Sequence, residues 1–348
     1  MKAAITFAFL SLAFCYASVA YADSFGSGGN TFDVEFVTIG NPGNAADTID
    51  GAPNVSGAQF FGSVAETFRM GKYEISEDMI NKANAQSAAD GDPLGITPST
   101  LGPNKPAGAV NWFEVVQFVN WLNTSTGSTE AYKFSGSTFE LWQPADAGYN
   151  PNNLYRNSLA KYFLPSADES YKAAFYDPTS GGYFSHATGS NSVPTAVASG
   201  TEAETAVWGQ PTSPGPADVM LAGGLSPYGT MGQNGNISEW EETEKDLVND
   251  SASILTHRGL RGGSWRDITS TAMRSNFRSS SHPQGGGSTF GFRVASILES
   301  SADFDQDGDK DGTDFLAWQL GLGITSGATK AQGDADNNGT VDAADLAI

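Results

Sequence analysis

Short apolar patterns, separated by long polar and glycine-rich stretches, run along most of the chain. Residues 32–37 alternate between apolar and charged or polar side chains, and this period of two predicts a β-strand. Residues 68–75 predict a second strand. Ser76 has a side chain that is favoured at a helix N-cap, so we expect a helix from there to about residue 85.

A longer amphipathic helix is predicted from Asn111 to about Leu122. Asn111 and Glu114 have the spacing of a capping box, in which each side chain bonds the other residue's backbone N–H. One face of the helix is apolar and consists of Trp112, Val115, Val116, Val119 and Leu122. A shorter third helix is expected to begin at Ser166. Residues 31–298 thus form one large region of short elements and long loops.

The N-terminal segment has the organisation of a secretory signal peptide. Lys2 supplies a positive start, and residues 5–19 are apolar. Ala20 and Ala22 frame a cleavage site before Asp23. A membrane anchor would need roughly 20 apolar residues, and the polar run from Asp23 ends the stretch too early. We therefore expect residues 1–22 to be removed and the protein to be secreted, to the extracellular space or the cell surface, without a membrane span.

Composition and charge restrict the chemistry of the mature chain. Cleavage before Asp23 removes the only cysteine, Cys15, and with it any disulfide, thiolate ligand or cysteine nucleophile. The formal net charge of -21 argues against nucleic acid and anionic membranes as partners, because the field of the protein repels both.

Six segments between residues 68 and 295 resemble, in order, the motifs of the formylglycine-generating enzyme family, also called the sulfatase-modifying factor family. They are residues 68–75, 110–122, 163–174, 235–240, 260–265 and 291–295, and the fifth reads Leu-Arg-Gly-Gly-Ser-Trp. The resemblance implies an α+β fold with little regular structure, related to C-type lectin-like folds, over residues 31–298.

The same resemblance implies a calcium site at Glu239. In this family the stretch binds calcium through backbone carbonyls and the glutamate side chain, and the carbonyl donors here would be Asn234, Gly235 and Ile237. Carboxylate and carbonyl oxygens suit this hard cation. The alternative is a glutamate that bonds backbone amides in a buried turn.

The family's active site is where this sequence departs from the pattern. Formylglycine-generating enzymes hold copper with two cysteines between the fifth and sixth motifs, and residues 266–282 contain none. A soft thiolate site cannot be rebuilt from serine, asparagine and arginine. The histidines, His186, His257 and His282, have no short ligand spacing, so we expect neither copper oxidase activity nor a non-haem iron centre.

A cluster of cations and one large aromatic residue remains in that region. We interpret it as a ligand groove formed by Trp265, Arg266, Arg274, Arg278 and Arg293. Guanidinium groups match planar oxyanions, so the groove would take carboxylates or sulfates of an anionic polysaccharide or peptide. The alternative is that these arginines pair with local acids and fix loops.

After a linker at residues 299–302, two twelve-residue loops carry acidic and polar residues at the positions of calcium ligands. The first loop contains Asp303, Asp305, Asp307, Asp309, Asp311 and Asp314, and the second contains Asp334, Asp336, Asn338, Thr340, Asp342 and Asp345. Gly308 and Gly339 occupy position 6, where the loop turns sharply. An apolar helix is expected after the first loop.

Duplicated loops with Asp at position 12 and a following helix resemble a type I dockerin. The resemblance implies bound calcium and docking to a cohesin-like domain through residues 303–348, although the sequence ends at Ile348, before an exit helix of the second loop. We therefore expect a bacterial-type extracellular protein whose large domain is a non-catalytic binding or structural component. The alternative is an enzyme on the same fold with oxygenase or transferase chemistry.

Overall fold

The computed structural model describes residues 21–53, 55–298, 302–305, 310–336 and 338–347. Most of the expected signal segment, residues 1–20, lies outside the described residues. So do residues 299–301 of the expected linker and the loop residues Asp307 and Asp309.

A five-stranded antiparallel sheet joins the two ends of the large domain. Its order is β1 (Tyr21–Phe25), β2 (Phe32–Ile39), β3 (Phe68–Gly71), β13 (Ala295–Ile297) and β6 (Tyr162–Phe163). The predicted strand at residues 32–37 is confirmed as β2, whereas β3 is shorter than expected. Strand β1 extends the sheet ahead of residue 31, the expected start of the domain. Arg69 fixes this strand by donating to both carboxylate oxygens of Asp23, at 2.9 and 2.7 Å.

The three helices of the large domain begin where the capping residues predict. They are α1 (Glu77–Asp90), α2 (Trp112–Ser125) and α3 (Ala167–Phe175). Both capping boxes form, with Asn111 and Glu114 at α2 and with Ser166 and Glu169 at α3. Helix α1 runs five residues longer than expected, because it ends only at Gly91, whose φ of 89° is a left-handed conformation that glycine tolerates.

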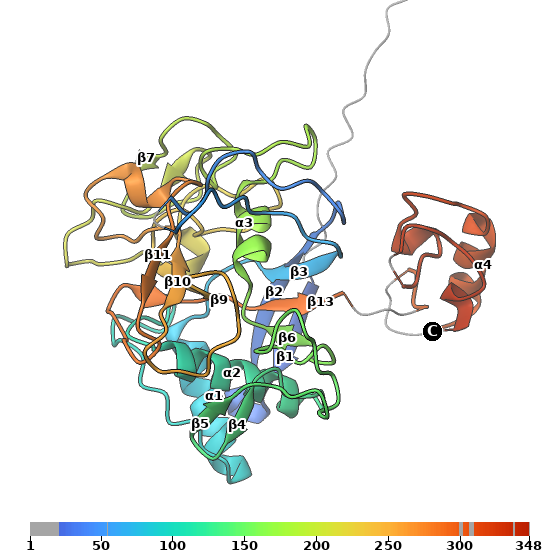
Figure 1. The fold of residues 1–348 in the computed structure, drawn as a ribbon, viewed down its shortest axis with the longest axis horizontal. Helices are drawn as coiled ribbons and strands as arrows, with labels where there is room; N and C mark the ends of the chain where they lie inside the picture. Colours follow the sequence, from blue (N-terminus) through green and yellow to red (C-terminus); the bar gives the residue numbers. More distant parts are fainter. Residues whose placement is uncertain (1–20, 54, 299–301, 306–309, 337, 348) are drawn as a thin grey trace, which may run out of the picture.

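The main core lies between α1, α2 and the sheet (Figure 1). The predicted apolar face of α2 is fully buried there. It packs with Phe25, Phe32 and Phe36 of the first two strands and with Tyr162 of β6. The sheet and the helices thus form one layered unit, and the mixed helix-and-sheet class is confirmed.

The large domain also contains a second, four-stranded sheet. Its strand order is β11 (Ser279–Ser281), β10 (Arg258–Arg261), β9 (Ser238–Glu244) and β12 (Phe290–Gly291). Strand β12 runs parallel to β9, and the other pairs are antiparallel. Two small ribbons pair β4 (Lys133–Ser135) with β5 (Thr138–Glu140) and β7 (Thr195–Ala196) with β8 (Thr205–Ala206). Long loops connect these elements, as the sequence predicts.

The remaining elements are short 3-10 turns and one helix in the C-terminal segment. The turns are η1 (Gly28–Asn30), η2 (Val219–Leu221), η3 (Ser270–Met273), η4 (Lys330–Gln332) and η5 (Asp345–Ala347), and the helix is α4 (Gly312–Gly321). The apolar helix predicted after the first acidic loop is therefore present. Within the described residues, no helix has the length and hydropathy needed to cross a membrane.

Candidate functional site

A cavity of about 550 Å³ opens where four loops of the large domain meet. Its walls come from residues 59–61, 151–154 and 166–168, and from Thr243 together with residues 247–250. The third of these segments is the start of α3, and the fourth is the end of β9 with the loop that follows it. Segments that are far apart in the sequence therefore build one concave surface, which is the usual form of a small-molecule site.

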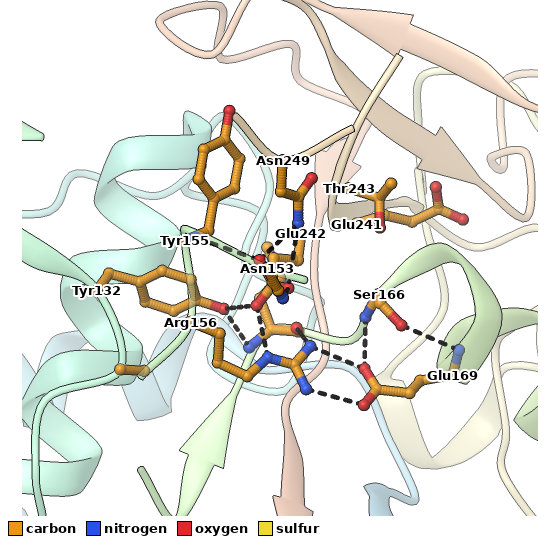
Figure 2. A network of polar contacts seen from close by, with 12 residues as sticks. Tyr132, Asn153, Tyr155, Arg156, Ser166, Glu169, Glu241, Glu242, Thr243 and Asn249 are labelled. Carbon is orange, nitrogen blue, oxygen red and sulfur yellow. Dashed lines mark hydrogen bonds and ion pairs between the residues drawn. The ribbon is translucent and has the colours of Figure 1, made fainter. Parts of the chain in front are cut away.

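A buried polar network joins three of these segments, those around Asn153, at the start of α3 and at the end of β9 (Figure 2). The carboxylate of Glu242, fully buried in β9, accepts from the Tyr132 hydroxyl at 2.7 Å, from Asn153 Nδ2 at 2.5 Å and from Arg156 Nε at 2.7 Å. The two terminal nitrogens of Arg156 donate to Glu169 of α3, each at 2.8 Å. The loop carrying Asn153 is thus fixed to both β9 and α3, and the cavity is preorganised.

The polar groups that line the cavity are amides, hydroxyls and carboxylates. No lysine, arginine or histidine of the described residues lines it. Phe60 and Val248, which are 53% and 54% exposed, add apolar surface. A site of this composition offers donors, acceptors and an apolar contact, but no cation for an anionic ligand.

Asp168 is the titratable group of this cavity whose environment is most unusual. Its Oδ1 accepts from the backbone N–H of Gly62 at 2.8 Å. Burial raises the pKa of Asp168 to about 6, although the bond from Gly62 acts in the opposite direction. A carboxyl group with a raised pKa in a cavity is typical of a functional site.

The structure does not assemble the predicted groove of Trp265, Arg266, Arg274, Arg278 and Arg293. Trp265 is buried and packs with Val207 and Ala217. Arg266 and Arg274 are exposed, and the guanidinium of Arg266 lies 5.6 Å from the centre of the Trp265 ring. Only these two of the four arginines are accessible to a ligand.

Arg278 and Arg293 are buried and already have their own acceptors. Arg278 donates from Nε to Glu241 at 2.6 Å and from Nη2 to the carbonyls of Thr243 and Glu244 at 2.9 and 3.0 Å. Both side chains are almost fully enclosed. The alternative interpretation, that such arginines pair with local acids and fix loops, therefore holds for these two, and they are removed from the groove.

Glu239, the expected calcium ligand, forms an ion pair with Arg293. Arg293 donates to both carboxylate oxygens, from Nε at 2.7 Å and from Nη2 at 2.5 Å. A calcium ion on these oxygens would stand against a buried guanidinium, so the residues present do not fit the metal. In this structure the Glu239 carboxylate is therefore engaged by Arg293.

Buried Glu74 lies beside this pair and holds the adjacent turn. It accepts from Asn236 Nδ2 at 2.6 Å and from the backbone N–H of Ile237 at 3.3 Å. Burial and the neighbouring Glu239 raise the pKa of Glu74 well above its usual range. The expected turn at residues 234–237 is therefore present, and its Asn236 side chain and Ile237 N–H bond the carboxylate of Glu74.

The two acidic loops of the C-terminal segment each bring three carboxylates together. Ligand oxygens of Asp303, Asp305 and Asp314 lie within 4.8 Å of one another, and so do those of Asp334, Asp336 and Asp345. These are positions 1, 3 and 12 of the predicted loops. All six donors are hard oxygens, so the residues present fit a calcium ion in each loop.

The two position-12 residues have equivalent roles. Asp314 accepts from the N–H of Phe304 at 2.5 Å and of Asp311 at 2.8 Å. Asp345 accepts from the N–H of Ala335 and of Asp342, both at 2.7 Å. Each carboxylate thus closes its own loop.

Three other predicted loop ligands accept hydrogen bonds from residues close to them in the sequence. Asp311 caps α4 by accepting from the N–H of Thr313 at 2.7 Å. Asn338 accepts from both the N–H and the hydroxyl of Thr340, and Asp342 accepts from the N–H of Ala344. Gly339 has a φ of 82°, which suits the sharp turn at position 6. Position 6 of the second loop therefore has a left-handed conformation that glycine tolerates.

Sequence reasoning did not find the cavity. No motif links Asp168 to the loops at residues 59–61, 151–154 and 247–250, because their meeting depends on the whole fold. It also treated the histidines as isolated, although His257 and His282 are in ring contact with centroids 4.4 Å apart. A three-dimensional arrangement was needed to see either feature.

Comparison with known proteins identifies the fold of the large domain. The family model described as the sulfatase-modifying factor enzyme 1-like domain matches residues 51–298. A comparison with curated proteins finds no match.

The match to this chain spans nearly the whole length of several solved structures. The chain is similar to Treponema denticola variable protein 1, with 20% identity and a TM-score of 0.55 over 80% of this chain and 99% of that one. CarF has 17% identity and a TM-score of 0.53 over 76% of this chain and 99% of that one. PvdO from Pseudomonas aeruginosa has 18% identity and a TM-score of 0.48 over 79% and 98%. At these identities, the first two show a common fold and leave ligand and reaction open.

Proposed function

The chain belongs to the sulfatase-modifying factor enzyme 1-like domain family, and from that premise we propose that it is a secreted, non-catalytic binding component of an extracellular assembly. The observation that carries the proposal is the preorganised cavity beside Asp168, with donors, acceptors and exposed apolar side chains but no cation. The segment that corresponds to the family's copper site contains no cysteine. Binding is therefore the activity that these side chains support best.

Carbohydrate with neutral, hydroxyl-rich residues is the ligand class that suits the cavity. Vicinal hydroxyls both donate and accept, and the amide of Asn152, the hydroxyl of Thr243 and the carboxylates of Asp168 and Asp250 complement them. The exposed Phe60 ring supplies an apolar surface for the C–H face of a sugar. Asp168 and Asp250 would repel the anionic ligands first expected for the arginine groove.

Calcium-dependent docking is the role we propose for the C-terminal loops. Three carboxylates in each loop have oxygens within 4.8 Å of one another, which supports a hard cation such as calcium as their ligand. Helix α4 exposes Phe315, Leu316 and Leu320, which are 45%, 52% and 80% exposed. Exposed apolar groups on an ordered helix favour a protein partner, and the dockerin-like spacing of the loops favours a cohesin-like domain.

Export with a mature N-terminus at Asp23 is consistent with the contacts of this residue. The Asp23 carboxylate accepts from Arg69 and from the Tyr162 hydroxyl, at 2.7 Å for the latter. Burial works against ionisation of Asp23, but Arg69 holds its pKa below the usual value. Cleavage before Asp23 would remove Tyr21 and Ala22, the first two residues of β1, and would keep Asp23 to Phe25, which pair with β2.

We expect Asp168→Asn to stabilise the protein above pH 6 and to weaken ligand binding. The folded-state pKa of about 6 lies above the ordinary value of 3.8, so the folded protein binds the proton more tightly than the unfolded chain. Stability is therefore lost as pH rises from about 4 to 6, and the neutral amide avoids that loss, roughly 1–3 kcal/mol at pH 7. The amide oxygen still accepts from Gly62. Thermal melts from pH 4 to 8 test this, and a constant difference between the two proteins at every pH would contradict it.

We expect no conversion of a sulfatase-type cysteine peptide into formylglycine. The reaction in this family requires two thiolates on copper, and residues 266–282 contain no cysteine. Mass spectrometry of the peptide measures the formylglycine product, and an oxygen electrode measures the oxygen consumed. Copper-dependent oxygen uptake with the peptide, above a protein-free blank, would overturn this prediction.

A further inference from the structure

His257 and His282 form a cross-strand pair at the edge of the second sheet. His257 directly precedes β10, and His282 directly follows β11. The antiparallel register pairs Arg258 with Ser281, so the next residue outward on each strand is a histidine. The ring centroids are 4.4 Å apart and the planes are tilted by 57°. Strand pairing therefore fixes the two imidazoles side by side.

The Nδ1 atoms of both rings point at oxygen atoms of the protein. His282 Nδ1 lies 3.3 Å from the carbonyl oxygen of Ile254, which can only accept, so this nitrogen carries the proton. His257 Nδ1 lies 3.5 Å from the Ser280 hydroxyl. For His282 this bond sets the tautomer that leaves Nε2 as a lone-pair donor. The Ser280 hydroxyl can act as acceptor or donor, and as acceptor it leaves His257 Nε2 as a lone-pair donor in the same way. Metal-binding histidines commonly have this outer-shell arrangement.

The surface around the pair carries charges of both signs. Lys245 and Asp246, both exposed and of opposite charge, line the adjacent hollow of about 310 Å³ together with His257. The neutral imidazole is the form that ligates metals.

We propose that His257 and His282 together bind a divalent transition ion of the imidazole-preferring kind, such as Cu²⁺ or Zn²⁺. The site is separate from the acidic calcium loops. His257 lies outside the segment 266–282 in which the family carries its copper-binding cysteines, and His282 is the last residue of that segment. Two protein ligands leave further coordination positions open beside the hollow. The ion would clamp the edge strand β11 to β10 and add a Lewis-acidic point to a surface that otherwise has none.

Copper titration of the untagged full-length protein tests this, with excess calcium present to occupy the carboxylate loops. Electron paramagnetic resonance should show a Cu²⁺ signal with two nitrogen ligands at one equivalent. His282→Ala, a change at an exposed side chain, should weaken binding at least tenfold and remove one nitrogen coupling, and His257→Ala should do the same. Ser280→Ala should weaken binding by about tenfold, the lower end of outer-shell effects. Ser279→Ala, an exposed neighbour on the same strand, should leave affinity and signal unchanged.

A measurement on the wild-type protein provides an independent check. One equivalent of Zn²⁺ should protect His257 and His282, but not exposed tyrosines, from diethylpyrocarbonate. If the His257→Ala/His282→Ala variant, with an unchanged near-ultraviolet circular dichroism spectrum, retains the affinity and nitrogen signal of the wild type, the proposal is wrong. Equal modification of both histidines with and without Zn²⁺ would also overturn it.

Discussion

Removal of calcium from the full-length protein should unfold the C-terminal segment and leave the large domain folded. Each of the two loops gathers three carboxylates into a cluster. The carboxylates of one cluster repel one another when no cation is bound. The core that joins the two loops is small and consists of Ala302, Phe304 and Ala335, with Ala317 and Trp318 packed against it. Such a core cannot offset the loss of chain entropy, so metal binding supplies part of the folding free energy. Calcium at 100 times its dissociation constant adds about 2.7 kcal/mol per site.

Hydrogen exchange with mass spectrometry measures this effect segment by segment. In chelator, the amides of α4 should lose their protection, while those of α2 keep theirs. Asp305→Asn and Asp336→Asn should each shift the calcium dependence to higher concentration, and Glu66→Gln, at an exposed carboxylate of the large domain, should not. Equal protection of α4 in chelator and in millimolar calcium would refute the expectation.

Glu241→Gln should destabilise the large domain by roughly 3–5 kcal/mol, the usual cost of removing one partner of a buried ion pair. Glu241 is 1% exposed and accepts from Arg261 Nε at 2.9 Å and from Arg278 Nε at 2.6 Å. Among the residues that the structure describes, Glu241 supplies the only carboxylate that these two guanidinium groups bond, and the amide removes it. For a domain of this size, each kcal/mol lowers Tm by about 2–4 °C.

The pH dependence of this effect gives a second readout. Burial alone would raise the pKa of Glu241, but Arg278 and Arg261 hold it below the usual 4.5. A depressed folded-state pKa stabilises the protein above pH 4.5, and that contribution is lost as pH falls through the folded-state value. The difference in Tm between wild type and variant should therefore shrink in acid. Lys82→Gln, which removes an exposed i,i+4 pair with Asp78, should change stability by less than about 1 kcal/mol.

Local rules predicted the helices well. Asn111 with Glu114 and Ser166 with Glu169 each bond within one turn, so their effect is visible in a few consecutive residues. The acidic loops are local in the same sense, since all ligands of a loop lie within twelve residues. Strand β1 was not predicted, because its place in the sheet depends on pairing with β2 and on the ion pair between Asp23 and Arg69.

The sequence does not reveal which carboxylate each buried arginine bonds, and for this reason the groove and the Glu239 site were not predictable. Arg293 is 54 positions from Glu239, and Arg278 is 37 positions from Glu241, so nothing in the sequence near either arginine reveals its acceptor. In a chain with 39 acidic residues, most arginines have an acid available. The cavity beside Asp168 has the same origin, because its four loops meet only after both sheets and α3 have packed.

A glycan array tests the central claim, that the large domain binds a neutral, hydroxyl-rich ligand in the cavity beside Asp168. It should be probed with the wild type, with Asp168→Asn/Asn152→Ala and with the matched control Arg266→Ala/Arg274→Ala, all in calcium. We predict that neutral glycans are retained by the wild type and by the control, and that the Asp168→Asn/Asn152→Ala protein loses them. Retention of sulfated or carboxylated glycans only, lost in the Arg266→Ala/Arg274→Ala protein and kept by the other variant, would contradict the account.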